Sequence, residues 1–385
     1  MTKKQKQLLI HLALFIITVI TTTLAGTEWM LSKYLLWVPK EAQLTWDSFV
    51  SGFQFSIPFL MILTVHEFGH YFTARFHKIN VTLPFYIPMW LGFILAPSFG
   101  TMGAFIRIKD QIISLKHYFD VGVSGPLAGF VVAMGVIWYG FTNLPEPEYI
   151  FEVHPEYEQY GLDYADHVYQ EENMVSYHLG DNLIFWFFKE YVADPERLPN
   201  PNEIIHYPYI LAGYLALFFT ALNLLPIGQL DGGHILFGLL GAKRHSMISK
   251  VLFTVFIFYA GLGLITIEDL ADVGIESSLQ YLLMILAYLY FLYVSARSMF
   301  ELKRDRWLFA AIIFTTQFMV HALFHISGYS GWLLFAFLLG RVLGVNHPPV
   351  FDNRPLDSWR KLIGWIALVV FILSFSPQPF IVSIS

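Results

Sequence analysis

Two histidines and a glutamate, His66, Glu67 and His70, stand within one apolar stretch, MILTVHEFGHYFTARF at residues 61–76. Positions i and i+4 of a helix lie one turn apart on the same face, so both imidazoles can bind one metal ion. Glu67 follows the first histidine, where its carboxylate can reach a water on that metal without being a ligand. In His-Glu-x-x-His sites, zinc lowers the pKa of water to about 7 and the glutamate takes the proton. Ionisable groups inside an apolar helix are costly, so the pattern indicates a functional metal site.

Asp231 is the candidate for the ligand that this pair lacks. Two histidines leave a catalytic zinc ion one protein ligand short of three, with the fourth position open to water. Asp231 follows a second apolar stretch and is the only carboxylate between Glu203 and Glu268. We therefore predict one Zn²⁺ ion bound by His66, His70 and Asp231.

The stretch FFTALNLLPIGQLDGGHILFG at residues 218–238 surrounds Asp231 with residues that have their own expected roles. Pro226 and the pair Gly232–Gly233 should end the helix near Leu225 and let the backbone approach the metal closely. Asn223 can donate a hydrogen bond to a substrate carbonyl or to the oxyanion formed from it, with helix packing as the alternative role. We assign catalytic roles to Glu67 and Asn223.

Other histidines compete with this interpretation. His321 and His325 also have i, i+4 spacing, but no glutamate lies between them. We therefore favour helix packing or an interfacial position for this pair over a second metal or regulatory site. His234 lies close enough to Asp231 in sequence to be an alternative ligand.

Composition predicts the environment of the site. The 385-residue chain is 56% hydrophobic and 14% charged, whereas soluble domains are about 25% charged. This is typical of an integral membrane protein. The chain has no cysteine, so a metal ion must be held by His, Asp or Glu.

Apolar runs of about 17–25 residues are candidate transmembrane helices. We predict an all-α integral membrane protein, a polytopic bundle of about nine spans. They lie near residues 8–26, 54–76, 121–142, 207–226, 248–267, 279–297, 307–325, 329–345 and 362–381. Three prolines interrupt the apolar segment 83–99, which favours a re-entrant or β-hairpin element after the second span.

Lysine and arginine indicate the orientation. They collect at the N-terminus, at 75–116, at 243–244, at 297–306 and at 354–361. Nine spans place all five clusters on one side, which the positive-inside rule makes cytoplasmic. The histidine pair and Asp231 then both fall in the cytoplasmic half of the membrane, so they can meet. We interpret the first span as a retained anchor, and the lack of an Arg- and Ser-rich transit segment favours a bacterial inner membrane.

Residues 144–206 form an acidic insert, with fourteen Asp or Glu against Lys189 and Arg197. We favour a solvated external loop over a small folded insert. Its four histidines, His154, His167, His178 and His206, show no ligand spacing. The predicted organisation is a first span with its external loop (1–53), two core halves (54–143 and 207–245) around the insert (144–206), and C-terminal transmembrane helices (246–385).

The sequence resembles the site-2 protease family of intramembrane zinc metalloproteases, whose signatures are His-Glu-x-x-His and Asn-x-x-Pro-x-x-x-x-Asp-Gly. HEFGH and NLLPIGQLDGG match both signatures. The stretch VSGPLAGFVVAMG (123–135) is similar to the family's third core span, and Gly125-x-x-x-Gly129 suits close helix contact. The PDZ domain of better-known bacterial members is absent and the insert stands in its place. This resembles the branch that includes chloroplast and bacterial homologues.

The resemblance implies the same zinc ligands, Glu67 as general base and Asn223 as a substrate-positioning group. The expected activity is hydrolysis of peptide bonds within or near transmembrane segments of membrane-protein substrates in the lipid bilayer, and we expect no nucleic-acid partner. The alternative is a metal-ion or proton transporter, because intramembrane His, Asp and Glu also line ion paths. Transporters commonly carry internal repeats, and neither motif recurs in this sequence.

Overall fold

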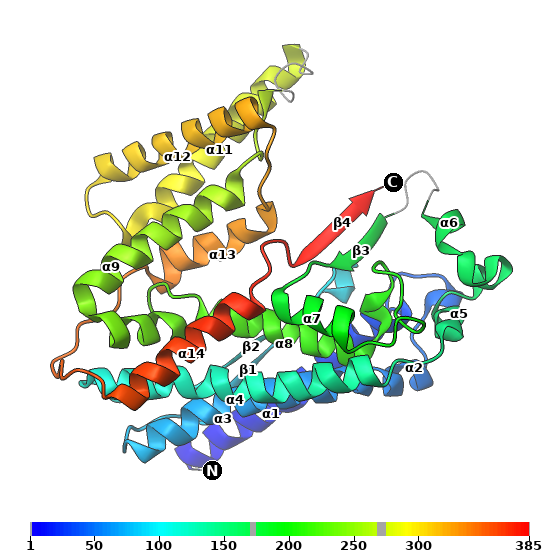
Figure 1. Cartoon of the computed structure of the whole chain (residues 1–385), viewed down its shortest axis with the longest axis horizontal. Helices are drawn as coiled ribbons and strands as arrows, with labels where there is room; N and C mark the ends of the chain where they lie inside the picture. Colours follow the sequence, from blue (N-terminus) through cyan, green and yellow to red (C-terminus); the bar gives the residue numbers. More distant parts are fainter. Residues whose placement is uncertain (1, 170–174, 268–274, 385) are drawn as a thin grey trace. The chain divides into compact units, whose positions relative to one another are not determined.

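The computed structural model is mostly helical and describes residues 2–169, 175–267 and 275–384 (Figure 1). The helices are α1 (Lys3–Leu31), α2 (Trp46–Ser51), α3 (Phe53–Phe76), α4 (Leu115–Thr142), α5 (Ile150–Val153), α6 (Ala165–Val168), α7 (Leu183–Tyr191), α8 (Pro208–Leu224), α9 (Asp231–Gly261), α11 (Ile275–Ser295), α12 (Lys303–Phe324), α13 (Leu333–Phe337) and α14 (Ser358–Ser374). The strands are β1 (Phe85–Met89), β2 (Gly100–Phe105), β3 (Val175–Leu179) and β4 (Phe380–Ile384).

Five helical segments of the described residues are long and apolar enough to cross a membrane. They are Lys3–Leu31, Trp46–Phe76, Leu115–Thr142, Leu279–Ser298 and Lys303–Phe324. Two further apolar helical segments, Pro208–Leu224 and Ser330–Leu343, are shorter. The protein is therefore a multi-pass membrane protein, while the number of nine spans stays a prediction.

The chain divides into two compact units. The first contains Met1–Ile112, Ser124–Leu222 and Val369–Ser385, and the second contains Ile113–Val123 and Asn223–Leu368. The chain therefore leaves the first unit twice and returns to it twice.

The core of the first unit lies among α3, α4, α7 and α8. Phe55, Ile137, Phe185 and Tyr214 are all less than 2% exposed and belong to one continuous apolar cluster. The hydroxyl of Tyr214 lies 2.7 Å from the carbonyl oxygen of Gly180 and 2.6 Å from that of Pro379. A buried hydroxyl needs such partners, and these two connect α8 to the ends of β3 and β4.

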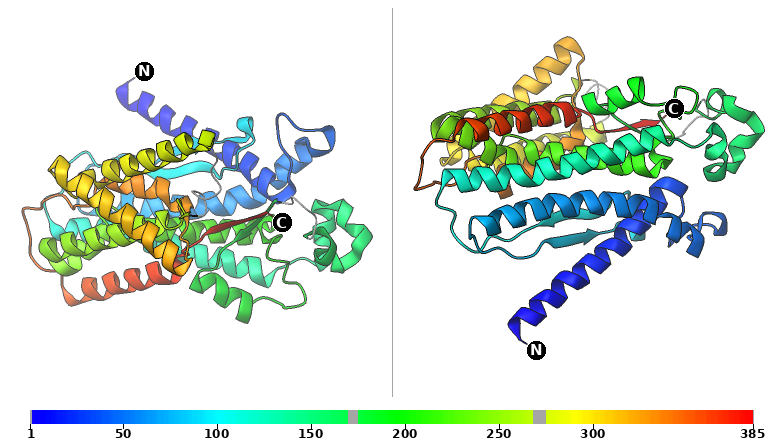
Figure 2. Two further views of the ribbon diagram at one scale, coloured as in Figure 1. Left: turned by 90° about the horizontal axis from the view of Figure 1, so that it is seen from above. Right: turned by 60° about the horizontal axis from the view of Figure 1, so that its bottom comes forward.

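The proline-interrupted segment after α3 contains an antiparallel hairpin, β1–β2, with an irregular register between Tyr86 and Pro88. The β-hairpin alternative of the prediction therefore describes this segment. Figure 2 shows α1 crossing α3 obliquely, and the hairpin packs against α1. The hydroxyl of Thr21 on α1 donates to the carbonyl oxygen of Gly100 over 2.7 Å.

The acidic insert folds over its described residues, so the solvated loop that we favoured is wrong there. Ile150, Val153, Tyr157, Tyr164 and Val168 form a small buried cluster. Apolar and aromatic side chains spaced along α5, α6 and the turns between them supply this core. The high proportion of acidic residues in the insert makes such a core hard to predict from composition.

The end of the chain differs from the expected ninth span at 362–381. Helix α14 stops at Ser374, and β4 pairs antiparallel with β3 of the insert from Leu179–Phe380 to Val175–Ile384 (Figure 1). An apolar run of β-branched and aromatic residues suits a strand as well as a helix end. Pairing with β3, which lies some two hundred residues earlier in the chain, makes this run a strand and not the end of a helix.

In the second unit, α9 is longer than the predicted fifth span at 248–267. It begins at Asp231 and changes direction at Gly241, where φ is 75° and ψ is 172°. Helix α8 ends at Leu224, two residues before Pro226, as predicted. The glycine pair at 232–233 instead lies in the first turn of α9.

The start of α7 gives a test of the folded insert. The side chain of Asn182, which is 5% exposed, caps α7 by accepting a hydrogen bond from the backbone N–H of Phe185. We expect Asn182→Ala to lower the free energy of unfolding by about 1 kcal/mol, because a buried helix donor loses its acceptor. Thermal unfolding in detergent measures this, and Asn182→Asp, which keeps an acceptor, is the control. Equal losses in the two variants would contradict the capping role.

Candidate metal centre

Helix α3 brings the two histidines of the HEFGH motif together. The Nε2 atoms of His66 and His70 lie 3.0 Å apart, and their ring centroids are separated by 4.8 Å. Glu67 Oε1 lies 3.9 Å from the Nε2 atom of His66. All three residues are buried, with exposed fractions of 5–7%. Two imidazole nitrogens aimed at one point, with a carboxylate beside them, form a donor set that fits a zinc ion.

Helix α4 makes room for these imidazoles through glycine. A Cβ atom on Gly125 would lie 2.2 Å from His70 Nε2, and one on Gly129 would lie 3.0 Å from His66 Cβ. A Cβ atom on Gly69 of α3 would lie 2.7 Å from the carbonyl oxygen of Ser124. The hydroxyl of Ser124 donates to the carbonyl oxygen of Gly69 over 3.1 Å. The close helix contact predicted from the Gly125-x-x-x-Gly129 spacing is confirmed.

The hairpin β1–β2 is joined to α3 close to the histidines. The hydroxyls of Thr64 and Tyr86 lie 2.8 Å apart and form a hydrogen bond. Thr64 lies two residues before His66 on α3, and Tyr86 belongs to β1. The hairpin is therefore held at the helix that carries the motif.

Asn223 and Asp231 belong to the second unit, and both are half-buried. Asn223 lies in the last turn of α8, and Asp231 opens α9, where a carboxylate is favoured by the helix dipole. The loop between them is fixed at Gly228, whose N–H donates to the hydroxyl of Ser249 over 2.9 Å.

The glycine pair after Asp231 has a packing role. A Cβ atom on Gly232 would lie 1.9 Å from the carbonyl oxygen of Leu224, and one on Gly233 would lie 2.3 Å from that of Gly228. Only glycine lets α9 begin so close to the loop that precedes it. Proline, and not this pair, ends α8, which corrects our expectation.

His234, the predicted alternative to Asp231 as a metal ligand, contacts another histidine within the second unit. Its Nδ1 atom lies 2.8 Å from Nε2 of His347, whose own Nδ1 lies 2.6 Å from the carbonyl oxygen of Pro348. Burial lowers the pKa of His347, which favours its neutral ring. Since the carbonyl of Pro348 can only accept, Nδ1 of His347 donates and its Nε2 accepts from His234.

The second histidine pair lies at the end of α12. His325 caps the helix in the left-handed conformation, with φ of 51°, and His321 Nδ1 lies 3.0 Å from the carbonyl oxygen of Ile326. The ring centroids of His321 and His325 are 6.3 Å apart. These contacts lie within the end of α12 and the turn after it, and the role of the pair stays a prediction.

Sequence reasoning missed another group of possible metal donors, formed by His154, Glu203 and His206 in the first unit. Two of its members, Glu203 and His206, are three residues apart, which was the one local signal. The third member lies about fifty residues earlier, and only the fold brings it to the others.

Comparisons with known proteins agree with the two motifs. The profile of Peptidase family M50 matches residues 54–267. The rice (Oryza sativa subsp. indica) protein named probable zinc metalloprotease EGY2, chloroplastic, is 27% identical over 190 residues, which cover 49% of this chain and 30% of that protein. Probable zinc metalloprotease EGY1, chloroplastic, from Arabidopsis thaliana is 26% identical over 205 residues, covering 53% of this chain and 32% of that protein.

The chain thus spans about a third of the length of these curated relatives. No solved structure matches the chain significantly. The family match covers more than half of the chain and includes the HEFGH and NLLPIGQLDGG motifs. The protein therefore belongs to peptidase family M50, as its resemblance to the site-2 protease family predicts.

Proposed function

We propose that the protein is an intramembrane zinc endopeptidase that hydrolyses peptide bonds within or near transmembrane segments of membrane proteins. The observation that carries the proposal is the buried group on α3, where two imidazole nitrogens converge beside a carboxylate on an apolar helix. Because the protein belongs to a peptidase family, hydrolysis of a peptide bond is the reaction that we assign to this group. Such side chains are retained in an apolar helix only when they are paired or functional.

The proposed zinc ligands are His66, His70 and Asp231. When bound, zinc acts as a Lewis acid that polarises the substrate carbonyl and lowers the pKa of water to about 7. Glu67 accepts the proton of the attacking water and returns it to the nitrogen of the leaving amine. Asn223 donates a hydrogen bond to the carbonyl oxygen as negative charge develops on it.

Peptide hydrolysis in a membrane also needs an unwound substrate whose backbone groups are satisfied. We propose that an extended segment of the substrate adds as a further strand to the edge of β2, with strand-to-strand hydrogen bonds providing the alignment. The hydrogen bond between Thr64 and Tyr86 supports this, since it joins the hairpin to the catalytic helix.

The proposed setting is a bacterial inner membrane, crossed about nine times, with the N-terminus and the active-site side facing the cytoplasm. The clusters of Lys and Arg support this orientation. A re-entrant position of the hairpin would place β2 at the depth of the zinc site.

The first test replaces Glu67 with Gln in the purified full-length chain. Gln keeps the shape and polarity of the side chain but cannot take a proton. We expect zinc content to stay near the wild-type level while cutting of a single-span membrane peptide falls at least about 100-fold, the usual contribution of a general base. A Glu67→Gln protein that still cuts would show that the assignment is wrong.

The second test addresses the fit between α4 and the histidines. We expect Gly125→Ala to weaken Zn²⁺ binding by about 10-fold or more, because the added methyl group would displace the imidazole of His70. Gly135→Ala on the same helix is the matched control, since its Cβ atom would meet no atom within 4 Å. Titration of the metal-free proteins with Zn²⁺ measures both, and equal affinities would exclude this geometry.

The third test concerns β2. Gly103 has φ of 106°, a conformation that β-branched residues avoid, although a Cβ atom there would meet no neighbour. We expect Gly103→Val to distort the strand and to slow cleavage at an unchanged zinc content. Met102→Val is the control, because Met102 is exposed and has an ordinary φ. If both variants cut at the wild-type rate, substrate does not bind along β2.

A further inference from the structure

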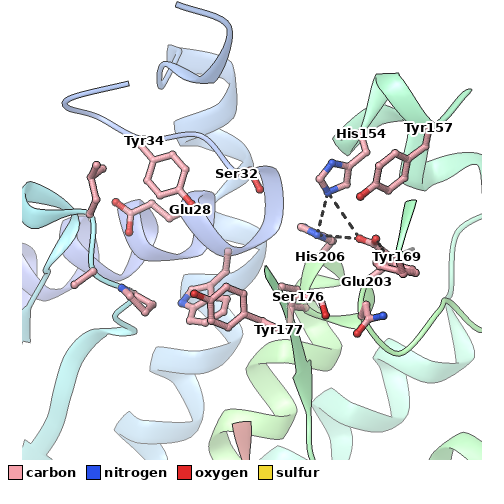
Figure 3. A pocket seen from close by; sticks show the side chains of 16 residues that line it. Glu28, Ser32, Tyr34, His154, Tyr157, Tyr169, Ser176, Tyr177, Glu203 and His206 are labelled. Carbon is pink, nitrogen blue, oxygen red and sulfur yellow. Dashed lines mark hydrogen bonds and ion pairs between the residues drawn. The ribbon is translucent and has the colours of Figure 1, made fainter. Parts of the chain in front are cut away.

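A second group of metal donors lies in the first unit, away from the HEFGH motif and between the insert and the end of α1. His154 follows α5. Glu203 precedes a short 3₁₀ turn, Ile204–His206, which ends at His206 and leads into α8. Figure 3 shows the three side chains pointing toward one another at the edge of a cavity. Glu203 and His206 are buried, with 3% and 5% exposure, and His154 is half-buried.

The distances form a nearly regular triangle. The Nε2 atoms of the two histidines are 3.4 Å apart, and Glu203 Oε2 lies 3.1 Å from His206 Nε2 and 3.8 Å from His154 Nε2. Donors placed about 2.0–2.2 Å from a tetrahedral zinc ion lie about 3.3–3.6 Å from one another. The three distances lie within a few tenths of an ångström of this range, so small shifts would bring the atoms to three corners of such a site.

The other ring nitrogens are engaged in the way that metal-bound histidines require. His206 Nδ1 lies 2.8 Å from the carbonyl oxygen of Met30, and His154 Nδ1 lies 2.9 Å from Oε1 of Glu156. Since a carbonyl and a carboxylate oxygen only accept, both Nδ1 atoms donate, and Nε2 is the nitrogen that each ring turns toward the centre of the triangle. Metal ligands are commonly oriented by such partners.

Three possible metal donors therefore surround the centre of the triangle. The two Nε2 atoms and Oε2 of Glu203 face the same point, and a metal ion there would bind each ring through Nε2 in place of a proton. The remaining oxygen of Glu203, Oε1, accepts a hydrogen bond from the hydroxyl of Tyr169. This hydrogen bond directs Oε2 toward the histidines.

We propose that His154, Glu203 and His206 form a second metal site, which binds a divalent transition-metal ion such as Zn²⁺. Two imidazoles and one carboxylate suit zinc. Three protein ligands leave a fourth position, and the adjoining cavity of about 270 Å³ gives it room for water or a small ligand. This site does not depend on the proposed protease activity.

Binding at this site would join three distant segments. His154 and the Glu203–His206 turn come from opposite ends of the insert, and Met30, which orients His206, belongs to α1. A metal ion would thus tie the insert into the first unit and stabilise the folded chain by mass action.

The experiment titrates the metal-free, full-length chain in detergent with Zn²⁺ and counts bound ions by calorimetry and elemental analysis. A background variant, His66→Gln with His70→Gln, removes the proposed catalytic site. We expect this background to bind one Zn²⁺ ion and to melt at a higher temperature when Zn²⁺ is present. Adding His154→Gln should weaken this binding at least about 100-fold, because a direct ligand matters more than an outer-shell partner.

The control is His167→Gln in the same background, since His167 is an exposed histidine of the same insert. We expect it to leave Zn²⁺ affinity unchanged. Tyr169→Phe is a milder probe that keeps all three ligands, and we expect about 10- to 100-fold weaker binding, the usual effect of an outer-shell partner. If the background variant does not fold, the same comparison is made between the wild type and the His154→Gln variant.

The proposal is overturned if the background binds no Zn²⁺, or if His154→Gln and His167→Gln bind it equally. Failure of the proposed function gives a different result. In that case the wild type binds a single ion, His154→Gln abolishes it, and the background variant retains it.

Discussion

The close approach of α3 and α4 is the constraint on which the first unit depends. In a membrane, helices associate through van der Waals contact and hydrogen bonds, because lipid is as apolar as the side chains between them. Gly69 lies against Ser124, while Gly125 and Gly129 lie against the imidazoles of His70 and His66. The small residues let two buried rings fit between the helices, so the packing that holds the unit together also fixes the orientation of the histidines.

Local spacing explains what could be predicted from the sequence. The i, i+4 positions of His66 and His70, the small residues at Gly125 and Gly129, and the end of α8 before Pro226 each follow from the geometry of one helix. Each of these signals lies within one segment of the sequence, although Gly125 and Gly129 make their contact with another helix, α3. The convergence of Asp231 on the histidine pair joins two units of the chain and stays a prediction.

Non-local pairing explains what could not be predicted. The residues of β4 have the apolar character of a helix end, and only the pairing with β3 makes them a strand. From sequence alone, the pair Gly232–Gly233 looks like the end of a helix. Its packing role follows only from the close approach of the preceding loop, at Leu224 and Gly228. His154 shows no ligand spacing because the two other donors lie about fifty residues away, and folding of the insert brings them together.

The return of the chain to the first unit has a consequence for biosynthesis. Residues 369–384 complete that unit, and β4 pairs with β3 after the whole of the second unit has been translated. Until then the edge of β3 and the hydroxyl of Tyr214 lack the partners that β4 and Pro379 later provide. Contacts of such long sequence separation form slowly. The first unit can therefore be completed only after residues 369–384 have been synthesised, which makes its last step of folding dependent on the end of β4.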